Sequence, residues 1–133
     1  MIQRLQTLFL LLFCGINAAN YFLFPVEYPL LNSTFETEAA LLVKLPLVFA
    51  LILFINVFLY KHRNRQLLIN RVVWIAFTLF WGSVVYLIVQ QGKEFSPYLA
   101  DLGLAFVGEV ALLMANRYIA KDEALIRSLD RLR

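Results

Sequence analysis

Apolar residues gather in four long stretches that alternate with short polar segments. The stretches cover residues 5–24, 39–60, 72–90 and 98–115. Each is close to the roughly 20 residues that an α-helix needs to cross a hydrocarbon core about 30 Å thick. The pattern therefore predicts an all-α integral membrane protein, a four-helix bundle that forms a single domain over residues 1–133.

The polar segments predict how these helices connect. The turns at residues 61–66 and 91–97 are short, so we expect helices two and three, and helices three and four, to be antiparallel neighbours. Pro46 falls about three turns into the second helix, where a missing N–H predicts a kink.

Positive charge is distributed unevenly along this pattern. Ten of the twelve Lys and Arg residues fall at the span ends that four crossings place on one side: Arg4, Lys61, Arg63, Arg65, Arg71, Arg117, Lys121, Arg127, Arg131 and Arg133. Because short, positively charged loops resist translocation, we expect both termini and residues 61–71 to be cytoplasmic in a bacterial inner membrane.

Composition agrees with the membrane class. Hydrophobic residues make up 62% of the chain, only 16% are charged, and the mean hydropathy is +0.74, far from the average soluble domain. We interpret the formal charge of +3 as orientation and contact with anionic lipid headgroups, and expect no nucleic-acid partner. The lone Cys14 lies in the first apolar stretch and cannot form an intrachain disulfide.

The tail after the fourth stretch, residues 116–133, is polar but patterned. Leucine and isoleucine recur in it at three- and four-residue steps, at Leu125, Ile126, Leu129 and Leu132. This spacing predicts an amphipathic helix continuous with the fourth span. Its apolar face either rests on the headgroups or on its own bundle, or docks another protein.

The two ends of the chain carry a further signal. The opening MIQRLQT at residues 1–7 and the closing segments ANR at 115–117 and KDEALIRSLDRLR at 121–133, together with the four spans, resemble a family of small Bacteroidota membrane proteins, domain of unknown function 4293. The resemblance covers the whole chain and implies a four-helix inner-membrane protein. It brings no catalytic residues and leaves the function open.

Glu109 is the strongest candidate for chemistry within a span. It lies about 11 residues into the fourth helix, hence roughly 16 Å deep at 1.5 Å per residue, where a carboxylate is very unfavourable unless paired or protonated. Three interpretations are open: a neutral acid hydrogen-bonded to Asn17 of helix one, a proton or cation site, or a group that faces a partner subunit.

Lys44 is the second charged residue placed within a span. Asp101 lies at a comparable depth on the fourth helix, so an ion pair between Lys44 and Asp101 is one expectation. Alternatively, the flexible lysine stem lets the ammonium snorkel to the headgroups, or Lys44 contacts a substrate.

Small residues predict where helices approach closely, because lipid supplies no hydrophobic drive for helix association. We expect the contact faces of helices one and four to contain Gly15, Ala19, Ala105, Gly108, Ala111 and Ala115.

Enzymatic patterns are largely absent. The single histidine, His62, lies in a basic turn beside Lys61 and Arg63, where we expect it to be solvated. The spacing of His, Cys and carboxylates offers no metal site, and the chain has no phosphate-binding glycine loop. We therefore expect no enzymatic activity and no cofactor.

The sequence favours a noncatalytic subunit or assembly factor that binds a larger membrane complex. The alternative is a small oligomeric proton-coupled transporter that uses Glu109.

Overall fold

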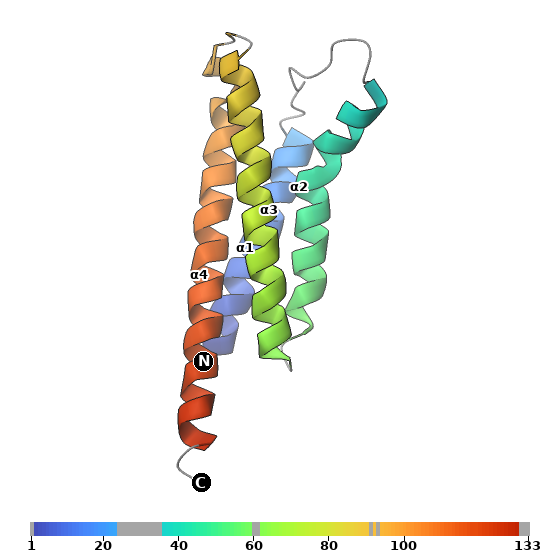
Figure 1. The fold of residues 1–133 in the computed structure, drawn as a ribbon. Coiled ribbons are helices and arrows are strands. Elements are labelled where there is room, and N and C mark those ends of the chain that lie inside the picture. The colour runs from blue at the N-terminus through green and yellow to red at the C-terminus, as the bar shows by residue number, and fades with distance from the viewer. Residues whose placement is uncertain (1, 24–35, 60–61, 91, 93, 131–133) are drawn as a thin grey trace.

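The computed structural model describes residues 2–23, 36–59, 62–90, 92 and 94–130, with side chains described within 5–23, 44–59, 62–90, 92 and 94–129. This part of the chain is helical: α1 (Ile2–Leu23), α2 (Glu36–Val57), α3 (Arg63–Gln90), the short 3-10 helix η1 (Ser96–Tyr98) and α4 (Leu99–Asp130). The four long helices run up and down in turn and form a bundle (Figure 1).

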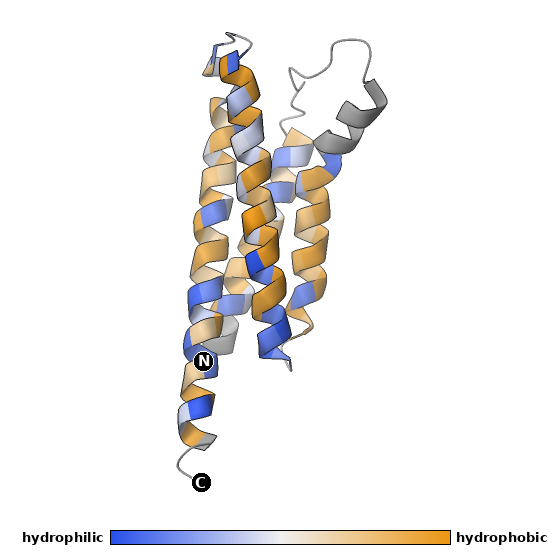
Figure 2. Cartoon of the chain, in the orientation of Figure 1, coloured by the Kyte–Doolittle hydropathy of each residue, from blue (hydrophilic) through white to orange (hydrophobic). Residues whose placement is uncertain are grey.

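Three segments are long and apolar enough to cross a membrane. They are Leu5–Leu23 of α1, the whole of α3, and Ser96–Leu129, which covers η1 and most of α4. In α2, the apolar part with described side chains, Lys44–Val57, is shorter. The length and composition of these helices indicate a membrane protein. Figure 2 shows apolar residues along the middle of the bundle with polar bands towards its ends.

The helices surround the core in chain order. α1 packs against α2 and α4, and α3 packs against the same two helices, whereas in the described part of the chain no Cα atoms of the diagonal pairs lie within 8 Å of each other. The N-terminus and the end of α4 lie at the same end of the bundle (Figure 1). We call this the termini end, and the other the opposite end.

Helix α3 begins earlier than the apolar pattern predicts. Its first residue is Arg63, so the predicted turn at residues 61–66 is wrong beyond His62. Chain reversal is completed by tight backbone bonds just before it, from Leu59 N to Asn56 O (3.1 Å) and from His62 N to Leu59 O (2.8 Å). The polar start of α3 is helical because Gln66 and Asn70, one turn apart, bury their side chains against the bundle.

The other connections follow their local chemistry. Pro46 is buried inside α2, and the first turns of α2 lean away from the bundle axis (Figure 1), as expected where proline removes a helical hydrogen bond. At the end of α3, Gly92 has φ +61°, a left-handed conformation that glycine adopts without strain and that commonly ends helices.

Aromatic side chains fill the centre of the bundle. Phe77 of α3 meets Phe13 of α1 edge to face at 5.0 Å and Phe49 of α2 at 5.8 Å between ring centroids. Phe13 and Phe77 are fully buried, as are Leu53 and Leu112. Such edge-to-face pairs stabilise a core by about 1 kcal/mol each beyond area burial, and these join three helices at one level.

Candidate functional site

Glu109 lies on the seam between α3 and α4. Its Oε1 accepts a hydrogen bond from Thr78 Oγ1 of α3 at 2.7 Å, and the Thr78 hydroxyl also lies 2.9 Å from the Trp74 carbonyl one turn away. Thr78 is exposed and Glu109 is half-buried. The carboxyl group therefore sits at the rim of the bundle and not in its centre.

The expected bond between Glu109 and Asn17 is wrong. Asn17 is 1% exposed and donates to the Phe13 carbonyl of its own helix at 2.9 Å. It lies against Gly108, where an added Cβ would stand 3.7 Å from its Nδ2. Glu109 follows Gly108 by one residue, which turns its side chain about 100° around α4, away from α1 and towards α3.

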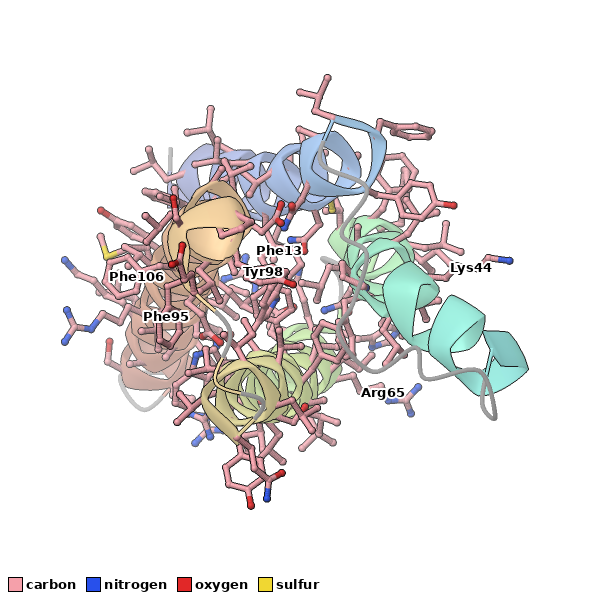
Figure 3. The ribbon with its side chains drawn as sticks, turned by 90° about the horizontal axis from the view of Figure 1, so that it is seen from above. Phe13, Lys44, Arg65, Phe95, Tyr98 and Phe106 are labelled. Carbon is pink, nitrogen blue, oxygen red and sulfur yellow. The ribbon has the colours of Figure 1, made fainter. Side chains whose placement is uncertain are left out.

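The expected ion pair between Lys44 and Asp101 is also wrong. Lys44 is exposed and points away from the bundle (Figure 3), whereas Asp101 is 4% exposed. The two helices that carry them, α2 and α4, lie diagonally across the bundle, and no Cα atoms of their described residues are within 8 Å of each other. The pair was predicted from the similar depth of the two residues alone. In the structure, their side chains point in different directions around the helices.

Asp101 and Asn20 are buried near the opposite end, and each leaves a polar atom unsatisfied. Asn20 of α1 is 5% exposed. The Oδ1 atoms of both residues lack a hydrogen bond to any described residue. No ion pair of Asp101 is found among the described residues.

At the termini end, α4 is fastened to α1 and α3 by a cluster around Asp122. The Asp122 carboxylate forms an ion pair with Arg63 at the start of α3 and accepts a bond from Gln6 Nε2 of α1 at 3.3 Å. One turn before Asp122, Tyr118 stacks on Phe9 of α1 with ring centroids 5.6 Å apart. These contacts hold the first part of the tail against the bundle.

The next residue, Glu123, joins a second set of partners. It pairs with Arg127 one turn later on α4 and accepts a hydrogen bond from the Asn64 amide of α3 when that amide nitrogen faces it. Two adjoining hollows, of about 430 and 460 Å³, lie between these parts of α3 and α4. Arginines from both helices line them, with Arg71 in the first and Arg65 in the second.

Three buried amides tie α2 to α3 at the same end. Asn56 Nδ2 lies 2.7 Å from Asn70 Oδ1 and 3.0 Å from the Gln66 carbonyl, and Gln66 Nε2 donates to the Asn56 carbonyl at 3.3 Å. Sequence reasoning missed Gln66 and Asn70, because both fell in the predicted loop. Their spacing of four residues was the available signal, since it places them on one face of a helix.

Beyond Glu123, the apolar side chains of the tail are exposed. Leu125, Ile126 and Leu129 are 46%, 40% and 63% exposed, although Ile119, two turns earlier, is fully buried. Leu132 lies outside the described residues. The apolar face predicted from the sequence is thus open to its surroundings where it is described.

The small residues of helix four lie in the bundle, whereas those of helix one differ. Ala105, Gly108, Ala111 and Ala115 are buried, and a Cβ on Gly108 would meet the Phe13 ring at 3.6 Å. Ala19 is half-buried, but Gly15 is exposed, and a Cβ added to it would meet no described atom within 4 Å. The expectation that Gly15 lies at a helix contact is therefore wrong.

His62 is exposed at the start of α3, facing one of the two hollows. Within the described residues, no group of three or more His, Cys, Asp or Glu side chains is placed to hold a metal ion. Cys14 is half-buried, and its Sγ lies 3.2 Å from the Ala50 carbonyl of α2. The described polar side chains mainly form hydrogen bonds and ion pairs that join helices. The exposed faces of the helices are surfaces on which another molecule can associate.

A family model described as "Domain of unknown function (DUF4293)" matches residues 28–132. The chain belongs to this family. The match runs from before α2 to the last residues of the tail, so it includes the seam around Glu109 and the ion pair of Arg63 with Asp122, but not α1. No curated protein and no solved structure matches the chain.

Proposed function

We propose that this protein is a noncatalytic subunit or assembly factor of a larger complex in a bacterial cytoplasmic membrane. The observation that carries the proposal is the end of α4, where a helix firmly fastened to the bundle presents Leu125, Ile126 and Leu129 as exposed side chains. An exposed apolar face on an ordered helix is a common docking surface for another protein.

The direction of the tail supports a protein partner over the lipid surface. α4 continues along the bundle axis past the ends of its neighbours (Figure 1). A helix that lies on headgroups runs in the plane of the membrane, whereas this helix leads away from it. The ion pair of Asp122 with Arg63 holds the base of the tail against α3 in this direction.

The proposed topology has four crossings with both termini in the cytoplasm. Arg63, Arg65, Arg71, Arg117 and Lys121 all belong to the termini end of α3 and α4, and basic segments stay on the cytoplasmic side. α2 has 22 residues, which is long enough to serve as the fourth crossing. A periplasm-active reporter fused after Arg133 should be silent, and strong activity there would contradict this orientation.

The position of Glu109 favours a subunit over a transporter. A proton-coupled transporter would need this carboxyl on a polar path, but Glu109 lies at the α3–α4 seam beside Thr78. Around it on α4, the outward residues are apolar, with Phe106 70% and Val110 44% exposed.

The test is affinity purification from the native membrane in mild detergent, with the partners identified by mass spectrometry. Leu125→Ser combined with Leu129→Ser should insert at normal abundance and lose the partner complex. Ser128→Ala is the matched control, because it changes the same turn without touching the apolar face, and it should retain the complex. Unchanged recovery of the same partners by the double variant would overturn the docking role of the tail.

A further inference from the structure

Lys44 on α2 and Glu109 on α4 are charged residues at the outer surface of the bundle. Lys44 points outward on the side away from Phe106 of α4 (Figure 3). Glu109 is half-buried and bonded to Thr78. Neither residue has an ion pair among the described residues, and no Cα atoms of the described parts of α2 and α4 lie within 8 Å of each other. Within one chain, the two charges therefore cannot neutralise each other.

The heights of the two charges along the bundle differ by about 7.5 Å. Phe49 of α2 packs against Phe77 and Phe80 of α3, with ring centroids 5.8 and 6.4 Å apart, and Thr78 bonds to Glu109 at the same level. Lys44 is five residues from Phe49 on α2, which is about 7.5 Å at 1.5 Å per residue. The flexible four-carbon stem of lysine can bridge an offset of this size.

Each charge is accompanied by an exposed apolar face. On α2, Val48, Leu51 and Ile55 continue the line of Lys44 at helical spacing and are 44%, 59% and 57% exposed. On α4, the neighbours of Glu109 include Phe106 and Val110, which are exposed as described above. These surfaces can pack against lipid or protein equally well, so complementary charge is what distinguishes one neighbour from another.

We propose that the α2 face of one copy packs on the α3–α4 seam of a second copy, with Lys44 paired to Glu109 of that second copy. The contact is head to tail, because the two surfaces lie on different sides of the molecule, and such contacts build rings or open rows of subunits. The inference rests on the proposed four-span topology, which sets neighbouring copies side by side in one orientation, so that Lys44 and Glu109 differ in depth only by this offset of about 7.5 Å.

Charge exchange tests the pair. Two differently tagged copies are expressed together, and the recovery of one with the other is measured in mild detergent. Lys44→Glu alone or Glu109→Lys alone in both copies should lower recovery about tenfold, the size expected for an interhelical polar contact. A chain that carries both changes should regain most of it. If the double variant is recovered no better than the single variants although its abundance is normal, the pair is wrong.

Cysteine cross-linking tests the same contact with both charges in place. Leu51 and Val110 lie at nearly the same level by the same helix alignment, and both are exposed. In a Cys14→Ser background, membranes that contain a Leu51→Cys chain and a differently tagged Val110→Cys chain should give a mixed disulfide on oxidation. Each chain expressed alone should not cross-link.

The matched control replaces Val110→Cys with Val89→Cys, near the opposite end of α3 and 59% exposed, which should give no mixed product. Efficient cross-linking of Leu51→Cys to itself would show a two-fold contact and overturn the head-to-tail arrangement. No mixed product with the Arg133 reporter silent would overturn the oligomer and leave the topology standing. An active reporter would instead show that the topology has failed.

Discussion

At the termini end, Asn56, Gln66 and Asn70 are buried and hydrogen-bonded across two helices, although Asn56 Oδ1 and Asn70 Nδ2 have no partner among the described residues. Asn20 and Asp101 at the opposite end are equally buried, and no hydrogen bond across helices joins their Oδ1 atoms to the described residues. A buried polar group that is satisfied joins helices, and one that is unsatisfied costs free energy. The bundle is therefore fastened mainly at the end where its termini lie. That is also the end from which the tail projects.

The largest expected effect comes from breaking the amide network. Asn56→Ala leaves Asn70 Oδ1 without its donor and removes the side-chain donor to the Gln66 carbonyl, so it should lower the free energy of unfolding by about 2 kcal/mol. Asn20→Ala is the matched control, because it removes a buried asparagine of similar exposure that joins no such network. Thermal unfolding in detergent measures both, and equal losses for the two variants would contradict the difference between the ends.

A smaller effect is expected from the ion pair of Arg63 and Asp122. Their side chains are 21% and 14% exposed, so the pair is partly shielded from water. A double-mutant cycle with Arg63→Gln and Asp122→Asn should give a coupling free energy of about 1 kcal/mol, the upper range for a pair that solvent still reaches. The pair of Glu123 and Arg127 supplies the comparison, because Arg127 is 68% exposed and an exposed pair at this spacing contributes only a few tenths of a kcal/mol. Coupling of equal size in the two cycles would contradict the role given to Asp122.

The sequence predicted the parts of the fold that depend on periodicity and length. Four apolar stretches became four helices, and the three- and four-residue steps of the tail continue α4 to Asp130. The start of α3 was missed because residues 63–71 are polar apart from the three apolar residues 67–69, and hydropathy cannot tell a mainly polar helix from a loop. A helix outside the hydrocarbon needs no continuous apolar run, only one buried face, which Gln66, Leu67 and Asn70 provide.

The candidate site was harder to predict, because its contacts depend on direction around each helix. Residue counting predicted the depth of Glu109 but not its hydrogen-bond partner. That partner is Thr78, and no pattern in the sequence marked Thr78 as such. Asn17 has nearly the right depth on α1 and the wrong direction, since it faces Gly108. Each residue along a helix turns the side chain by about 100°, so neighbouring positions at one depth face different helices.

The smallest expected effect is the coupling between Lys44 and Asp101, and it tests that argument directly. Both were assigned a similar depth, yet Lys44 points outward and Asp101 is buried on the helix that lies diagonally across the bundle from α2. Lys44→Met and Asp101→Asn should therefore change thermal stability independently, with a coupling free energy below about 0.5 kcal/mol, as for residues that share no partner. Asp101→Asn alone should be neutral or stabilising, because it replaces a buried carboxyl that has no ion pair among the described residues with an uncharged group of the same shape. A coupling free energy well above that limit would place the two side chains in contact. It would also mean that depth alone, without direction around the helix, is enough to predict which residues pair.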